Sequence, residues 1–194
     1  MSDFRKIAFV GNYLPRKCGI ATFTHDLRHA IQGVVPDGQC SVIAVSDGKE
    51  NYDYPDEVRF EIAEQNPDDY LRAAEYLNLL NVDVVSLQHE FGIYGGPSGS
   101  HVLNMLRRLR MPFITTLHTI LKQPSVEQRR VMQELTSLSS RLVVMSDCGR
   151  AILKETYSVP ERKIDVIPHG IPDMAFADPN FFKDQYSVRA AAYC

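Results

Sequence analysis

Short runs of β-branched and apolar residues alternate along this chain with longer amphipathic stretches, and this alternation limits the possible fold more than any other feature. Several runs, such as 82–87 and 141–145, are almost continuously apolar, which is typical of strands that are covered on both faces. Strands that alternate with helices predict an α/β domain. We therefore expect one Rossmann-like domain with a mostly parallel sheet of about seven strands and helices on both faces.

The boundaries of these elements follow from periodicity and from helix-capping residues. Pro67, followed by two acidic residues, suits the first turn of a helix, Ser146 or Asp147 can cap another, and Gly33 is expected to end the first. The polar segment 47–56 is expected to be an exposed loop. Strands are predicted at 6–10, 41–45, 58–62, 82–87, 113–117, 141–145 and 163–167, and helices at 20–33, 67–80, 98–110, 125–138 and 147–157.

The composition excludes several classes of protein. With 194 residues, 44% of them hydrophobic, and a net charge of −3, the chain can bury a core and lacks the basic surplus of a nucleic-acid-binding domain. No apolar run approaches the ~20 residues that span a bilayer, and no signal peptide is evident. The four cysteines lack a C-x-x-C pair, so they are interpreted as separate reduced thiols. We expect a cytoplasmic protein.

Three histidines follow the ends of predicted strands. His89 precedes Glu90 after the fourth strand, His118 follows the fifth, and His169 precedes Gly170 after the last. Ligands of open parallel sheets bind beyond the carboxyl ends of the strands, so these side chains are expected along one edge. His118 is the strongest candidate for a polar contact with a sugar hydroxyl or a phosphate, because its strand is otherwise apolar.

A second candidate feature is the loop 11–19, between the first strand and the first helix. Its spacing matches neither the dinucleotide fingerprint nor the P-loop. Gly19 and Ile20 nevertheless open a helix whose free N–H groups favour anions, and Arg16 and Lys17 add positive charge. Two interpretations of this loop are equally supported: contact with a phosphate or sugar, and an ordinary strand-to-helix connection with solvated cations.

Two other interpretations are weaker. His89, Glu90 and His118 could supply two imidazoles and a carboxylate to a metal, but nothing in their spacing fixes a coordination geometry, so no metal is expected. The stretch 102–110 could form a basic amphipathic helix on an anionic membrane. A packed helix with a solvated basic side is favoured over peripheral membrane contact.

Three segments carry a resemblance to a known family. Residues 15–27 (PRKCGIATFTHDL), 87–96 (LQHEFGIYGG) and 166–172 (VIPHGIP) resemble the amino-terminal half of family 4 retaining glycosyltransferases, particularly a mannosyltransferase-like bacterial group. The resemblance extends from about residue 6 to 186. Thr116 to Thr119 and Ser146 with Asp147 also lie where that family has such residues.

The resemblance implies half of a GT-B fold, in which two Rossmann-like domains face a cleft and no metal or other cofactor is required. The Gly19 loop, with Arg16, Lys17 and Ile20, would approach the diphosphate and sugar of a nucleotide-sugar donor, and GDP-mannose is the donor that the subgroup suggests. His118 would contact the transferred sugar as the catalytic residue. The remaining residues that we expect to bind substrate, including a sugar or lipid-linked acceptor, are His89, Glu90, Tyr94, Ser146, His169 and Gly170.

The sequence also departs from the family. Residues 1–186 are interpreted as the acceptor-side domain and 187–194 as a tail outside the family pattern. No two glutamates have seven residues between them, although such a pair marks the donor half in the family. We therefore expect little transfer activity from this chain alone.

Two alternatives from other classes stay open. The chain could be a non-catalytic module that pairs with a separate donor domain, regulates a relative or self-associates through an uncovered apolar surface. It could also be an NAD-dependent dehydrogenase in which Asp47 holds a ribose, although the missing glycine fingerprint weighs against this.

Overall fold

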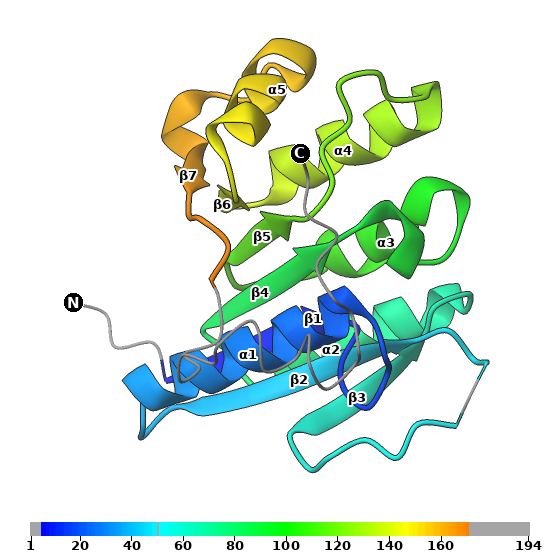
Figure 1. The fold of residues 1–194 in the computed structure, drawn as a ribbon. Helices are drawn as coiled ribbons and strands as arrows, with labels where there is room; N and C mark the ends of the chain where they lie inside the picture. The colour runs from blue at the N-terminus through cyan, green and yellow to red at the C-terminus, as the bar shows by residue number, and fades with distance from the viewer. Residues whose placement is uncertain (1–4, 50, 171–194) are drawn as a thin grey trace, which may run out of the picture.

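A computed structural model describes residues 5–49 and 51–170. Within them, seven parallel strands form one sheet in the order β3-β2-β1-β4-β5-β6-β7 (Figure 1). This confirms the expected Rossmann-like α/β class, with a sheet that is entirely parallel. The proposed domain boundary at 186/187 lies outside the described residues. The strands are β1 (Lys6–Gly11), β2 (Gln39–Ser46), β3 (Val58–Ala63), β4 (Val84–His89), β5 (Phe113–Leu117), β6 (Arg141–Val144) and β7 (Ile164–Val166).

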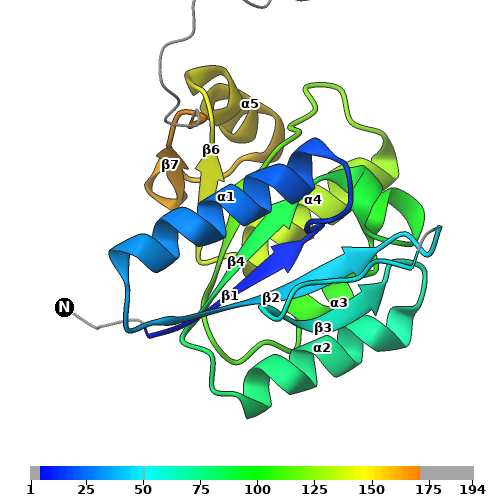
Figure 2. The same cartoon turned by 60° about the horizontal axis from the view of Figure 1, so that its bottom comes forward.

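Helices cover the two faces of the sheet unequally. Ile7 and Phe9 of β1 pack with Leu27 and Ile31 on one face, under α1. The alternate residues of the strands join a larger core cluster with the other helices, and Figure 2 shows α1 lying alone across its face. The α-helices are α1 (Gly19–Val34), α2 (Pro67–Leu79), α3 (Val102–Leu106), α4 (Val126–Leu138) and α5 (Asp147–Tyr157), and the short 3-10 turns are η1 (Phe91–Ile93), η2 (Pro97–Gly99) and η3 (Glu161–Lys163).

Local capping explains where several helices begin. The Asn66 side chain accepts a hydrogen bond from Asp68 N, and Pro67 occupies the first turn of α2, as predicted. Ser125 and Gln128 form a reciprocal capping box at the start of α4. Gly33 does not end α1, which runs to Val34.

The prediction of a helix over 98–110 was wrong in its extent. Gly96 and Gly99 have positive φ angles of 77° and 74°, and Ser98 has 53°, so the chain turns tightly before α3 begins at Val102. The apolar residues Met105 and Leu106 are buried, whereas the arginines 107, 108 and 110 are exposed.

Most described residues of the segment 47–56 are exposed, as its composition predicts. Tyr52 and Tyr54 are half-buried, and Tyr54 packs on the core cluster beneath α1. The side chain of Tyr54 therefore covers apolar surface of β2 and β3 on the face that α1 covers elsewhere. Cys18, Cys40 and Cys148 are free thiols, and Cys194 lies outside the described residues. No helix in the two described ranges is long and apolar enough to cross a membrane.

Candidate functional site

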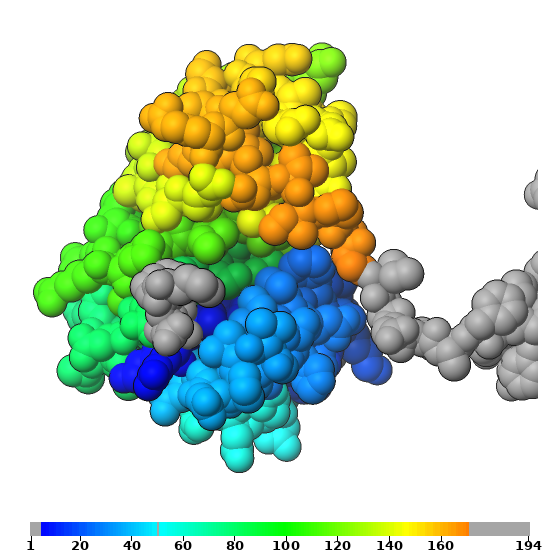
Figure 3. Space-filling view, turned by 90° about the vertical axis from the view of Figure 1, so that its left-hand side faces the viewer, coloured from blue at the N-terminus to red at the C-terminus, as the bar shows by residue number. Residues whose placement is uncertain are grey.

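Polar side chains gather at the carboxyl edge of the sheet, beside the start of α1. His89 ends β4, His118 follows β5, and the backbone N–H of His118 donates to the carbonyl of His89 at 3.0 Å. Residue 169 follows β7, and Figure 3 shows this orange end of the described chain against the blue start of α1. The three histidines therefore lie along one edge, as the strand ends predict.

Phe23 of α1 holds two of these histidines near each other. Its ring meets that of His118 edge-on, with centroids 4.8 Å apart, and that of His169 at 5.3 Å. His169 is exposed, and its Nδ1 lies 2.7 Å from the carbonyl of Gly170. Phe23 was not among the predicted residues, because an aromatic residue in an amphipathic helix carries no signal that distinguishes a site contact from core packing.

His118 is a neutral group at pH 7. Burial lowers the pKa of its imidazole to about 4; Glu90 opposes this shift and His169 adds to it. A neutral imidazole carries one N–H donor and one acceptor nitrogen, so His118 can bind a polar ligand but cannot serve as a standing positive charge. Its Nε2 lies 3.1 Å from Oε1 of Gln88.

His89, the last residue of β4, faces the opposite side of the sheet from Gln88. Its side chain is fully buried, stacks on Tyr94 at 6.1 Å and meets the edge of Phe91 at 5.1 Å. Neither of its ring nitrogens has a hydrogen-bond partner among the described residues. Burial lowers the pKa of His89 to about 3, with a smaller contribution from His118, so it stays neutral inside this aromatic enclosure.

Tyr94 supports this edge from within. Its side chain is 3% exposed, and its hydroxyl donates to the carbonyl of Gln88 at 2.6 Å. Glu90 follows His89 in the sequence and is partly exposed. Its charge favours a higher pKa for His118. Direct contact of either residue with a substrate stays a prediction.

The loop before α1 gives a ligand access to the helix N-terminus. Cys18 caps the helix, and its Sγ accepts from Ala21 N at 3.3 Å. Gly19 is exposed, and a Cβ built on it would meet no atom within 4 Å. The backbone of Gly19 and Ile20 is therefore open to a group that favours the positive end of the helix dipole.

The two cations of this loop differ in their surroundings. Lys17 is exposed, whereas Arg16 pairs with Asp47 at 3.4 Å across the ends of β1 and β2. Burial raises the pKa of Asp47, but hydrogen bonds from Lys49 N and Tyr52 and the charge of Arg16 outweigh it, so the net shift is downward. These contacts occupy the carboxylate to which the dehydrogenase alternative assigned a ribose.

Ser146 has a structural role in this fold. Its hydroxyl accepts a hydrogen bond from Gly149 N at 3.2 Å and so caps α5 at the end of β6. The residue is exposed, and substrate contact there stays a prediction.

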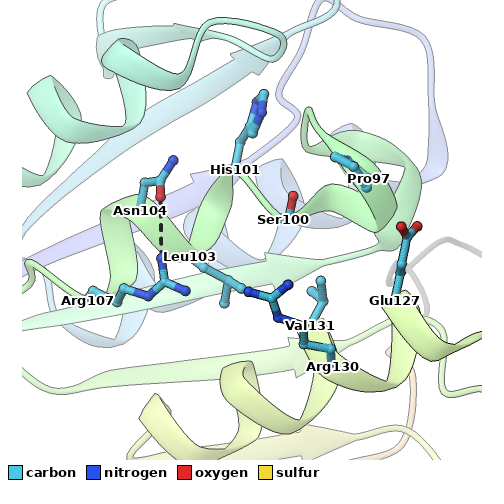
Figure 4. Close-up of a pocket in the computed structure, with 9 residues that line it drawn as sticks. All are labelled: Pro97, Ser100, His101, Leu103, Asn104, Arg107, Glu127, Arg130 and Val131. Carbon is cyan, nitrogen blue, oxygen red and sulfur yellow. Dashed lines mark hydrogen bonds between the residues drawn. The ribbon is translucent and has the colours of Figure 1, made fainter.

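In the described part of the chain, no group of three or more His, Cys, Asp or Glu side chains is placed to hold a metal ion. The structure also contains a hollow of about 320 Å³ between α3 and α4, on the face opposite α1. Figure 4 shows Arg107 and Asn104 facing each other there, with Arg130 and Glu127 on the neighbouring helix. None of the predicted site residues lines this hollow.

The fold and the edge just described define a Rossmann-like α/β domain with a histidine-lined site beside the N-terminus of its first helix. Residues 19–173 match the model of the family described as Glycosyltransferase Family 4. Since this match covers most of the sequence, the chain belongs to that family.

Solved structures support the fold. A glycosyltransferase from Rickettsia africae ESF-5 has a TM-score of 0.60 and 18% identity, over 96% of this chain and 51% of that one. The lipopolysaccharide outer core galactosyltransferase WaaB, in its apo form, has a TM-score of 0.61 and 11% identity, over 86% and 46%. This chain thus spans about half the length of the two proteins. A search of the curated proteins found no match.

Gln88 is the functional candidate that the sequence analysis missed. Successive residues of a strand point to opposite faces, so Gln88 and His89 cannot face the same side. Gln88 faces His118 and α1, whereas His89 faces the aromatic cluster of the other side. Its one signal in the sequence was a polar residue directly after the predicted strand 82–87.

Proposed function

We propose that this chain is the acceptor-side domain of a retaining glycosyltransferase that uses a nucleotide-sugar donor. The observation that carries the proposal is that His118 and His169 both contact Phe23 beside the open start of α1, with Glu90 acting electrostatically on His118. A neutral imidazole suits a sugar hydroxyl, and the helix N-terminus suits a diphosphate. Family membership supports a sugar substrate of this kind.

The chemistry that the edge would perform is stabilisation of charge. When the glycosidic bond to the donor breaks, the leaving nucleoside diphosphate gains negative charge. Preorganised N–H groups of Gly19 and Ile20, together with Lys17, would stabilise that charge in the transition state. We propose GDP-mannose as the donor and a sugar or lipid-linked sugar as the acceptor. Because the chain spans about half of its structural relatives, we expect transfer to need a donor domain as well.

Titration calorimetry with GDP-mannose, other nucleotide sugars and lipid-linked acceptors tests this proposal. We expect saturable binding that His118→Ala weakens by roughly tenfold or more, the cost of losing a hydrogen bond and a buried contact. His29→Ala is the matched control, because His29 is exposed on α1. Absence of binding to every sugar compound contradicts the proposal, and recovery of a partner protein under those conditions would favour a non-catalytic module.

A further inference from the structure

Gln88 is completely buried, yet it is polar and joins two elements of the proposed site. Its Nε2 donates to Oγ of Ser86 at 3.1 Å, and its Oε1 faces Nε2 of His118 at 3.1 Å. A Cβ at Gly11 would lie 3.0 Å from Cβ of Gln88, so the glycine on the neighbouring strand leaves the space that this side chain fills. The amide is therefore held at both ends and along its stem.

The direction of these two hydrogen bonds sets the chemistry of His118. An amide nitrogen only donates and an amide oxygen only accepts. In the structure the amide nitrogen points at the Ser86 hydroxyl, which can accept or donate, and the amide oxygen points at the imidazole; a hydrogen bond at this contact requires the ring nitrogen to carry the hydrogen. We propose that Gln88 is a positioning residue that holds His118 as its Nε2–H tautomer and leaves Nδ1 as the free acceptor.

The surroundings of His118 also restrict the position of its ring. Its backbone N–H is bound to the carbonyl of His89, and Phe23 lies across the ring at 4.8 Å. Its Nδ1 has no hydrogen-bond partner among the described residues. An acceptor nitrogen binds a hydroxyl group and repels an unprotonated phosphate oxygen. Resting on the proposed function, the inference assigns His118 to a sugar hydroxyl and leaves the diphosphate to the start of α1.

Nitrogen NMR of the ¹⁵N-histidine-labelled chain tests the tautomer directly, with the spectrum of His118→Asn to assign the signal. We expect His118 Nε2 to show a protonated shift and Nδ1 an unprotonated one at pH 7. The opposite pattern would mean that the amide is reversed and donates to the ring, which overturns the proposal. This readout needs no substrate, so it stands apart from any failure to bind nucleotide sugars.

Variants then test whether Gln88 is responsible. In Gln88→Glu a carboxylate faces the ring, and the midpoint of the His118 titration should move upward by about 1–3 pH units. In Ser86→Ala the amide loses its anchor, so the second tautomer of His118 should become several times more populated. Gln133→Glu, at an exposed position of α4, should change neither signal. An unchanged His118 signal in a folded Gln88→Glu or Ser86→Ala chain would refute the role of Gln88.

If the variants of Gln88 do not fold, the wild-type tautomer and Ser86→Ala still decide the question. If they fold and nucleotide sugars bind, Gln88→Met should weaken that binding by about fivefold to tenfold, the factor that one hydrogen bond of ordinary net strength represents. Equal affinity in Gln88→Met and wild type, with the tautomer changed, would contradict the assignment of Nδ1 to the ligand.

Discussion

The rings of Phe23 and His118 meet edge to face, with centroids 4.8 Å apart and planes at 88°. Phe23 belongs to α1 and His118 follows β5. The two residues are 95 positions apart in the sequence, so local chain geometry does not constrain this pair. The contact places the first helix directly over the candidate site, and the same phenylalanine reaches His169 beyond β7. One side chain thus sets the spacing between two histidines.

Replacing Phe23 with leucine should loosen this arrangement without opening a large cavity. We expect a loss of about 0.5–1.5 kcal/mol in unfolding free energy, the worth of an aromatic pair beyond its buried area. The free energy of sugar binding should fall by more than the free energy of unfolding, because His118 loses its lateral support. Chemical denaturation and calorimetry measure the two effects. Phe60→Leu, which removes the aromatic contact with Tyr76 on β3 and α2, should cost similar stability and leave binding unchanged.

Acidification should destabilise the domain through two histidines. His89 and His118 have folded pKa values of about 3 and about 4, below the ordinary value of about 6.5, so the unfolded chain binds protons more readily than the folded one. Their contribution to stability is complete above pH 6.5 and declines as the pH falls toward 4. Over this range the free energy of unfolding should fall by roughly 1.4 kcal/mol per pH unit for each ring.

The variant His89→Phe should flatten that slope by about half, because it retains the contacts with Phe91 and Tyr94 and removes a titrating group. Melting temperatures between pH 7 and pH 4.5 measure it, with His29→Gln as the exposed control. Parallel curves for His89→Phe and wild type would show that His89 does not titrate as its burial requires.

Gly95→Ala should severely destabilise the loop that supports Tyr94. A Cβ at Gly95 would lie 1.8 Å from the carbonyl oxygen of Glu64, so backbone must move. We expect a loss of about 3 kcal/mol or more, the upper range for overpacking. At Gly92, where an added Cβ meets nothing within 4 Å, alanine should change stability by less than about 1 kcal/mol. Urea denaturation compares the two variants, and equal midpoints would contradict the close approach of Gly95 to Glu64.

Arg16 and Asp47 should affect anion binding in opposite directions. Arg16→Gln removes a cation beside the start of α1, and we expect pyrophosphate or a nucleoside diphosphate to bind roughly tenfold more weakly. Asp47→Asn releases Arg16 from its ion pair, so the same ligands should bind several times more tightly. Arg59→Gln, on exposed surface of β3, is the control.

Calorimetry at two salt concentrations distinguishes the effect of this ion pair on affinity from a general effect of net charge. Salt screens all exposed charges alike, so a general effect should weaken equally in both variants. If Arg16→Gln and Asp47→Asn change affinity in the same direction, the ion pair supports the loop and does not compete with the ligand.

Much of the scaffold could be predicted without coordinates. The near-continuous apolar runs predicted the parallel strands, and the histidines that follow them lie at one edge because all strands point the same way. The helix over 98–110 could not be delimited, because positive φ angles at Ser98 and Gly99 depend on the close packing of Gly95 to Gly99 against their neighbours.

The roles within the site needed the tertiary structure. Sequence reasoning selected His89 and Glu90 after the fourth strand and did not consider Gln88, although the Gln88 side chain lies within hydrogen-bond distance of the His118 ring. It also could not show that Arg16 would meet Asp47, whereas the prediction of Ser146 as a helix cap is confirmed.

The linear pattern of apolar and polar residues determined the fold class and the order of elements, and it predicted the edge at which a ligand would bind, because the periodicity that distinguishes strands from helices is a local property of the chain. The tertiary structure alone decided which side chains meet there and in what protonation state. Those outcomes depend on which face of each strand α1 covers and on the burial that results, and both arise only when distant segments pack together.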